Sequence, residues 1–250
     1  MSESGIATVV MNCPPANSLT RTLIAGMHEC FDHLAGQKEI RALILIGAGK
    51  YFVAGGDIKE FLTFTPETAC EATEWGQELM NKIERFPVPV IAAINGFALG
   101  GGLEMALACD IRIASETAKV GMPECTLGLI PSYGGTTRLP KTVNFGKAKM
   151  MIYTGEIMSA EEAKAIGLIQ EVTPPEALME RCAKIAGAIA KNAPIAVRQA
   201  KAVINRTRES DTAASLENET NAIRVCFRSE DLREGSQAFV EKRTPAYRNR

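Results

Sequence analysis

Short apolar segments alternate with stretches of helical spacing over the first 120 residues, and this alternation constrains the fold more than any other feature of the chain. Residues 19–34 and about 66–86 carry apolar side chains every three or four positions, which predicts helices. Because strand, crossover helix and strand in repetition imply parallel pairing, the pattern predicts the α/β fold class. The expected strands are residues 6–11, 41–46, 90–94, 111–114 and 119–122.

The character of the sequence changes near Pro140, beyond which the spacing is helical. Ser159-Ala-Glu-Glu is typical of a helix start, with a hydroxyl cap followed by acidic residues. We therefore expect an α/β core over 1–190 and a helical C-terminal region over 191–250. The expected helices beyond Pro140 are residues 145–153, 159–166, 175–191, 195–205, 212–227 and 229–240.

Composition and charge exclude some classes of function. The 250 residues are 46% hydrophobic and 23% charged, with a formal net charge of -1. A chain of this length can bury one sizeable core. It lacks the overall basic charge that would indicate nucleic acid or a membrane surface as the main partner. An anionic ligand would have to be held by a few lysines and by backbone donors.

The cysteines and the first residues indicate a cytoplasmic protein. Seven cysteines, an odd number, are scattered without a CxxC pair, which argues against both a disulfide framework and a zinc site. We expect no metal. The start Met-Ser-Glu-Ser-Gly has neither a signal-peptide pattern nor an apolar run of membrane-spanning length.

The first candidate site segment is Ala54-Gly55-Gly56-Asp57-Ile58-Lys59. Glycine lets the backbone turn sharply and brings an N–H close to a ligand, because no Cβ stands in the way. Taken alone, the segment is better explained as a simple turn.

The second segment is Asn95-Gly-Phe-Ala-Leu-Gly-Gly-Gly-Leu-Glu104. A glycine triplet that opens a helix presents free N–H groups at the positive end of the helix dipole, where a phosphate or a developing oxyanion can bind. The segment is not GxGxxG, which disfavours a nucleotide cofactor. Glu104 stands among Leu, Met, Ala and Cys, where a carboxylate is costly to bury without a purpose. Complementing the helix dipole is its simpler explanation.

The third segment runs from Gly121 to Leu139 and contains Glu124, which is the only acidic residue between Ala118 and Ala148. A carboxylate on a loop is usually just solvated, but this one is isolated among apolar residues and glycines. Two backbone-donor segments and two isolated carboxylates together fit proton transfer beside a polarised carbonyl.

At these segments the sequence resembles the crotonase (enoyl-CoA hydratase/isomerase) superfamily, and most of all an enoyl-CoA hydratase. The similarity is carried by NGFALGGGLEMALACDIRIAS and GMPECTLGLIPSYGGTTRLP, and it extends from Pro14 to the tail at Arg243. The resemblance implies a spiral of ββα units with a helical C-terminal region that forms a homotrimer, often stacked into a homohexamer.

The resemblance also implies roles for individual residues. The backbone N–H groups of Gly56 and Gly101 would polarise a thioester carbonyl. Glu104 and Glu124 would hold one water molecule, with Glu104 helping to activate it and Glu124 delivering a proton to the α-carbon. Both glutamates matter, because isomerases of the family commonly keep only the second.

The resemblance places the coenzyme A portion of the substrate along the first candidate segment, and no separate cofactor is expected. Lys59 would lie near the phosphates. Phe227 would contact the adenosine, and Lys242 would reach the CoA of a neighbouring subunit. Tyr133 would stand near the acyl end. The expected acyl-CoA contacts are Ala54, Gly55, Ile58, Lys59, Tyr133, Phe227 and Lys242.

Some residues depart from the family pattern. The loop 12–17 lacks the lysine or arginine that many members place against CoA, and Gly56 replaces a common alanine. Ser132-Tyr133 replaces the frequent Gly-Ala, which adds an aromatic ring and a hydroxyl. Phe61, Phe64 and Trp75 occupy the variable region that walls the acyl chain, so the sequence leaves chain length open.

The function expected from the resemblance is that of a lyase, the reversible hydration of a trans-2-enoyl-CoA to a 3-hydroxyacyl-CoA in fatty acid β-oxidation. One alternative is isomerisation of the double bond, or hydration of a branched, cyclic or polar acyl-CoA, which Ser132-Tyr133 motivates. A more distant alternative is a non-catalytic RNA-binding or scaffold protein, against which the near-neutral charge and the glutamate pair both argue.

Overall fold

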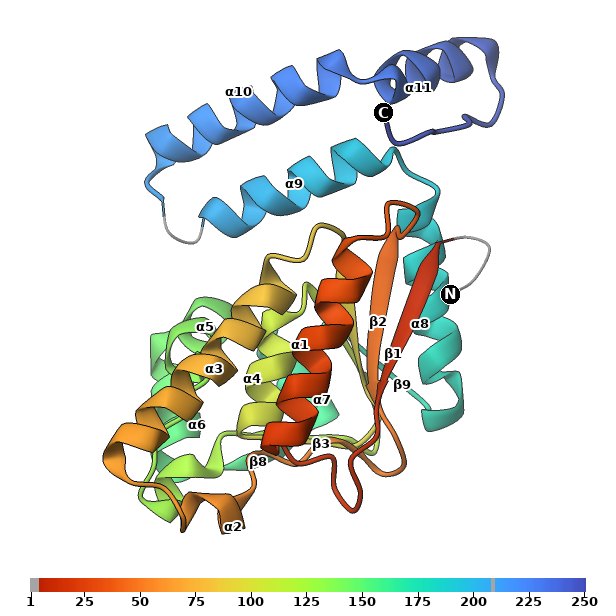
Figure 1. Ribbon diagram of the computed structural model, residues 1–250. Helices are drawn as coiled ribbons and strands as arrows, with labels where there is room; N and C mark the ends of the chain where they lie inside the picture. Colours follow the sequence, from red (N-terminus) through yellow and green to blue (C-terminus); the bar gives the residue numbers. More distant parts are fainter. Residues whose placement is uncertain (1–4, 208–209) are drawn as a thin grey trace.

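The computed structural model describes residues 5–207 and 210–250, which form two β-sheets surrounded by helices (Figure 1). One sheet has five strands in the order β1-β2-β4-β6-β9, all paired in parallel. The other has the order β3-β5-β7-β8, in which only the β7–β8 pair is antiparallel. The strands are β1 (Ile6–Met11), β2 (Ala42–Gly47), β3 (Tyr51–Val53), β4 (Val90–Ile94), β5 (Phe97–Leu99), β6 (Ile111–Ser115), β7 (Lys119–Gly121), β8 (Ile157–Ser159) and β9 (Glu171–Thr173).

Successive turns of the chain repeat one pattern, in which a strand of the first sheet is followed by a strand of the second sheet and then by a helix. The pairs β2–β3, β4–β5 and β6–β7 each follow it, so the expected α/β spiral of ββα units is confirmed. The helical segments are α1 (Arg21–Ala35), α2 (Ile58–Phe61), α3 (Pro66–Glu84), α4 (Gly101–Ala108), η1 (Pro123–Leu127), α5 (Gly135–Val143), α6 (Phe145–Thr154), α7 (Ala160–Ala165), η2 (Pro175–Ala177), α8 (Leu178–Ala190), α9 (Pro194–Thr207), α10 (Thr212–Arg228) and α11 (Glu230–Glu241).

The central strands of the five-stranded sheet are buried on both faces, which explains their nearly continuous apolar runs. On one face, Leu43 and Leu45 of β2 belong to the main core together with residues of α1, α3 and α4. On the other face, Ile44 of β2 packs with Leu178 and Cys182 of α8. Alternate residues of one strand therefore contribute to two hydrophobic clusters.

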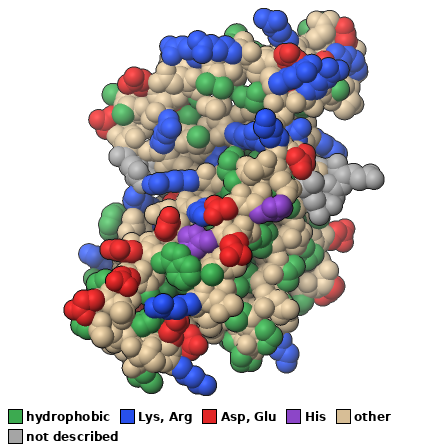
Figure 2. All heavy atoms as spheres, in the orientation of Figure 1, with side chains coloured by type: hydrophobic (Ala, Val, Ile, Leu, Met, Phe, Trp, Pro, Cys, Tyr) green, Lys and Arg blue, Asp and Glu red, His purple; other side chains and the backbone are tan. Residues whose placement is uncertain are grey.

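Helices α9, α10 and α11 extend away from the sheets as a separate layer (Figure 1). Helix α9 is fixed to the core by Lys201, whose Nζ lies 2.7 Å from Asp110 Oδ2 and donates to Val88 O at 3.0 Å. On the face seen in Figure 2, Lys and Arg side chains are prominent over this region, with hydrophobic side chains between them. Phe227, Phe239 and other large apolar residues of these helices are exposed.

The expected strands and helices agree with the observed ones to within a few residues, but several observed elements were not predicted from the sequence. The short strands β3, β5, β8 and β9 were not expected, since three residues are too few to show a period. Helices α2 and α5 were also missed, and α5 contains Pro140, a residue that normally ends a helix. The Ser159 cap is confirmed, because its hydroxyl accepts from Glu162 N and the Glu162 carboxylate accepts from Ser159 N.

In the described part of the chain, no helix is both long and apolar enough to cross a membrane.

Candidate active site

Helix α4 begins at the glycine triplet, and its first turn forms the centre of the candidate site. Gly100 has φ +52° and ψ -123°, a conformation that glycine adopts without strain, and it turns the chain from β5 into the helix. The N–H of Gly101, the first helical residue, has no hydrogen-bond partner within residues 5–207 and 210–250. It is one of the unpaired donors that a helix N-terminus presents to a ligand.

Glu104 lies one turn into α4 and is only 2% exposed. Its Oε1 accepts a hydrogen bond of 2.6 Å from the N–H of Gly135, the first residue of α5. Burial raises the pKa of Glu104 to about 8; the hydrogen bond from Gly135 opposes this shift, and the negative charge of Glu124 adds to it. Desolvation dominates because hydrogen bonds from the backbone of Gly135 and Tyr133 do not replace the full hydration of a carboxylate.

Glu124 approaches the same place from η1. A Cβ added at Gly100 would lie 2.6 Å from Glu124 Oε1, so the carboxylate rests against the turn that leads into α4. Its other oxygen, Oε2, is buried and has no hydrogen-bond partner among the described residues. Burial raises the pKa of Glu124 as well. A buried carboxylate oxygen without a partner indicates a position for a water molecule or a ligand.

Gly56 follows β3 and supplies a second free donor. Its N–H, like that of Gly101, has no hydrogen-bond partner in the described part of the chain. Leu19 forms a bridge with Gly56 and donates to Gly55 O at 2.8 Å, and its side chain reaches Gly101. The Phe61 ring packs where a Cβ of residue 56 would be, which accounts for a glycine at this position.

The remaining residues of the first candidate segment lead from Gly56 to the surface. Asp57 caps α2 by accepting from Lys59 N at 3.0 Å. Ile58 and Lys59 are exposed, and Ala54 is half-buried. Lys59 has no ion-pair partner among the described residues, so its ammonium group is available to an anionic ligand.

Tyr133 lies beside the same turn of α4. A Cβ added at Gly101 would lie 3.5 Å from Tyr133 Cδ2. Burial raises the pKa of Tyr133 to about 12, and the charges of Glu104 and Glu60 add to the shift. The phenol therefore stays protonated at neutral pH, and its hydroxyl can form hydrogen bonds only as a neutral group.

Two of the expected contacts do not reach this site within the chain. Phe227 lies in the last turn of α10 and Lys242 follows α11, in the layer that Figure 1 shows beyond α9. Phe227 is 69% exposed. Sequence reasoning also missed Gly135, although Gly134-Gly135 opens a helix just as the glycine triplet opens α4.

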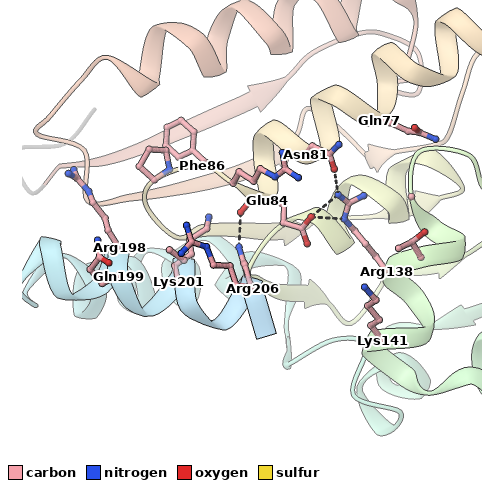
Figure 3. A pocket seen from close by; sticks show the side chains of 16 residues that line it. Gln77, Asn81, Glu84, Phe86, Arg138, Lys141, Arg198, Gln199, Lys201 and Arg206 are labelled. Atoms are coloured by element: carbon pink, nitrogen blue, oxygen red, sulfur yellow. Dashed lines mark hydrogen bonds and ion pairs between the residues drawn. The ribbon is translucent and has the colours of Figure 1, made fainter. Parts of the chain in front are cut away.

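A cleft of about 770 Å³ lies between α3, α5 and α9, and neither glutamate of the pair lines it (Figure 3). It is rich in cations, but Arg138 and Lys201 are engaged in ion pairs. Arg138, 8% exposed, binds Glu84 at 2.7 Å and Asn81 at 2.8 Å, and donates to Tyr133 O at 3.2 Å. The cleft wall thus supports the loop that carries Tyr133.

No group of three or more His, Cys, Asp or Glu side chains suited to hold a metal ion is present in residues 5–207 and 210–250. The chemical groups at the site are two backbone N–H donors and a pair of carboxyl groups with raised pKa values. Such groups can stabilise an oxyanion and exchange protons with the carbon atoms beside it.

Comparisons with known proteins all find similarity to enoyl-CoA hydratases. The family model described as enoyl-CoA hydratase/isomerase matches residues 1–250. A short-chain-enoyl-CoA hydratase of Clostridium acetobutylicum is 42% identical over 243 residues, 96% of this chain and 93% of that protein. A crotonyl-CoA hydratase of Syntrophomonas wolfei is 40% identical, with 96% and 94% covered. The crystal structure of an enoyl-CoA hydratase from Bacillus anthracis matches with a TM-score of 0.93 and 43% identity, covering 97% of this chain and 96% of that one.

Proposed function

The chain belongs to the enoyl-CoA hydratase/isomerase family, and on this premise we propose that it catalyses the reversible addition of water to a trans-2-enoyl-CoA, giving a 3-hydroxyacyl-CoA. The observation that carries the proposal is the pair Glu104 and Glu124, two carboxyl groups brought to one turn of α4 with raised pKa values and an unpartnered buried oxygen. Double-bond isomerisation needs only one such group.

The N–H groups of Gly56 and Gly101 would bind the thioester oxygen. As water adds, the carbonyl becomes enolate-like and its oxygen gains negative charge. The dipole of α4 and the two free donors stabilise that charge without first having to give up partners. Loss of one such donor typically costs about 3–4 kcal/mol of transition-state stabilisation.

The two glutamates divide the proton transfers. Glu104 accepts a proton from water as its oxygen bonds to C3, and Glu124 gives its proton to C2 as the enolate collapses. The pair must therefore hold one proton in total. Burial raises the pKa of both carboxyl groups, and the charge of Glu124 raises that of Glu104 further, so the pair keeps a shared proton at neutral pH. The reaction as proposed proceeds from the form of the pair in which Glu124 carries this proton and Glu104 is ionised.

The CoA portion would lie along Ala54, Gly55 and Ile58, with Lys59 near its phosphates. CoA thus enters as part of the substrate, and the proposal includes no further cofactor. Phe227 and Lys242 would contact CoA across a homo-oligomer, either a trimer or a dimer of trimers. Their distance from α4 within the chain and the exposed apolar side chains of α10 and α11 support an intersubunit role.

The test of the proposal is the loss of conjugated-thioester absorbance when the protein acts on crotonyl-CoA, with the product identified as 3-hydroxybutyryl-CoA. Glu104→Gln and Glu124→Gln should each lower kcat by at least about 10²-fold, the usual contribution of a general acid or base. Full activity in Glu124→Gln would overturn its role. Formation of only a rearranged enoyl-CoA would favour isomerisation instead.

A second experiment separates the two glutamates. Butyryl-CoA has no double bond to hydrate, but its C2 protons can exchange with D₂O at the site. If Glu124 serves C2, Glu124→Gln abolishes this exchange and Glu104→Gln retains most of it. The reverse pattern, followed by NMR, would exchange the two roles and leave the hydratase proposal standing.

A further inference from the structure

The Tyr133 ring occupies a notch between two glycines. A Cβ at Gly76, in the middle of α3, would lie 2.6 Å from Tyr133 Cζ, while the opposite edge of the ring faces Gly101. A glycine inside a helix lowers the stability of the helix by about 1 kcal/mol relative to alanine, so its presence in α3 needs a structural reason. Gly76 therefore stands where any side chain would collide with the ring.

Helix α3 also fixes the backbone that carries this ring. Gln77 Nε2 donates to Ser132 O at 2.8 Å, and Arg138 donates to Tyr133 O at 3.2 Å. Arg138 is in turn held by Asn81 and Glu84 of α3 (Figure 3). The notch and these hydrogen bonds come from one helix, so the ring and the helix form a single unit.

The ring stands beside the groups that would surround the reacting atoms. In the proposed reaction, Gly101 binds the oxygen on C1, and the glutamates serve C2 and C3. The Tyr133 ring lies beside Gly101, 3.5 Å from where a Cβ of that residue would be, and the charge of Glu104 contributes to raising the pKa of its phenol. An acyl chain that continues past C3 towards α3 would meet the ring.

We propose that Tyr133, seated in the notch at Gly76, closes the acyl end of the site and restricts the substrate to short, crotonyl-sized acyl groups. The inference rests on the hydratase activity proposed above. It assigns the selection of acyl-chain length to Tyr133 and Gly76, which lie 57 positions apart in the sequence. The role of Gly76 is not evident from the sequence, because glycine has no side chain.

The test compares kcat/KM for crotonyl-CoA and trans-2-decenoyl-CoA. Tyr133→Ala should raise the C10-to-C4 ratio at least about tenfold, since even one methylene accommodated or refused in an apolar pocket is worth about 10-fold or more. Tyr133→Phe is the matched control, because it keeps the ring and should keep the ratio. Tyr133→Leu is measured in parallel in case the alanine variant does not fold, with folding checked by thermal melting.

Gly76→Ala tests the notch itself. Its methyl group would push the ring towards Gly101, so kcat/KM for crotonyl-CoA should fall at least about tenfold in the wild-type background, and by less than about twofold when Tyr133 is already alanine. An unchanged C10-to-C4 ratio in both Tyr133→Ala and Tyr133→Leu, or an equal effect of Gly76→Ala in the two backgrounds, would overturn the inference alone. Absence of hydration by the wild type would overturn the proposed function instead.

Discussion

At the scale of single residues, Glu104 couples protonation to folding stability. Its pKa rises from 4.5 to about 8 on folding, so the stability it contributes is fully present below pH 4.5 and is lost as the pH rises through 8. Glu104→Gln stays neutral and still accepts from Gly135 N. It should match the wild type at pH 5 and melt up to about 10–20 °C higher at pH 9, because a pKa rise from 4.5 to about 8 corresponds to about 5 kcal/mol.

Differential scanning calorimetry at both pH values measures this effect, with Glu78→Gln as the control, because Glu78 is exposed on α3. A Glu104→Gln variant no more stable than the wild type at pH 9 would contradict the assigned cause. The carboxylates that matter were visible in the sequence because they interrupt apolar segments. Gly135 and Gly76 were not, since their roles depend on Glu104 and Tyr133, which the fold brings to them from far along the chain.

At the scale of elements, an ion pair between Lys201 and Asp110 attaches α9 to the core, together with a hydrogen bond of 2.9 Å from Asn205 Nδ2 to Glu84 O. Lys201 is 8% exposed and binds Asp110, whose Oδ2 also accepts from Val90 N at 2.7 Å. Lys201→Met leaves that carboxylate without its cation, so the free energy of unfolding should fall by about 3–5 kcal/mol. Combining it with Asp110→Asn, which removes the stranded charge, should restore part of the loss.

Urea unfolding measures these differences, and Lys191→Met provides an exposed lysine for comparison. A change below about 0.5 kcal/mol in Lys201→Met, the range of ordinary surface substitutions, would show that α9 is held by other contacts. The sequence predicted α9 from its spacing but not this attachment. Periodicity reports which face of a helix is apolar, whereas Lys201 and Asp110 meet through tertiary packing and gave no local signal.

At the scale of the whole molecule, the layer α9–α11 exposes several large apolar side chains. Phe227, Phe239 and Val240 are 69%, 86% and 76% exposed. Surfaces of this kind mark interfaces. The sequence indicated the helical region but not which side chains it exposes, because that depends on how far the layer stands from the sheets. Exposure of Phe227 and of the end of α11 is what the proposed contact with a neighbouring subunit requires.

If Lys242 binds the CoA of a neighbouring subunit, two variants that are each defective should complement each other in a mixed oligomer. Glu104→Gln lacks a working glutamate pair, and Lys242→Ala keeps the pair but should raise KM several-fold. In mixed oligomers from co-expression, intact glutamates of one chain would meet the intact lysine of the other, so steady-state kinetics should show a fraction of sites with the wild-type KM. Glu104→Gln mixed with Glu124→Gln is the control, because both defects lie within one chain's site and no wild-type site can form. A mixture that keeps only the raised KM of Lys242→Ala would place the lysine outside any shared site.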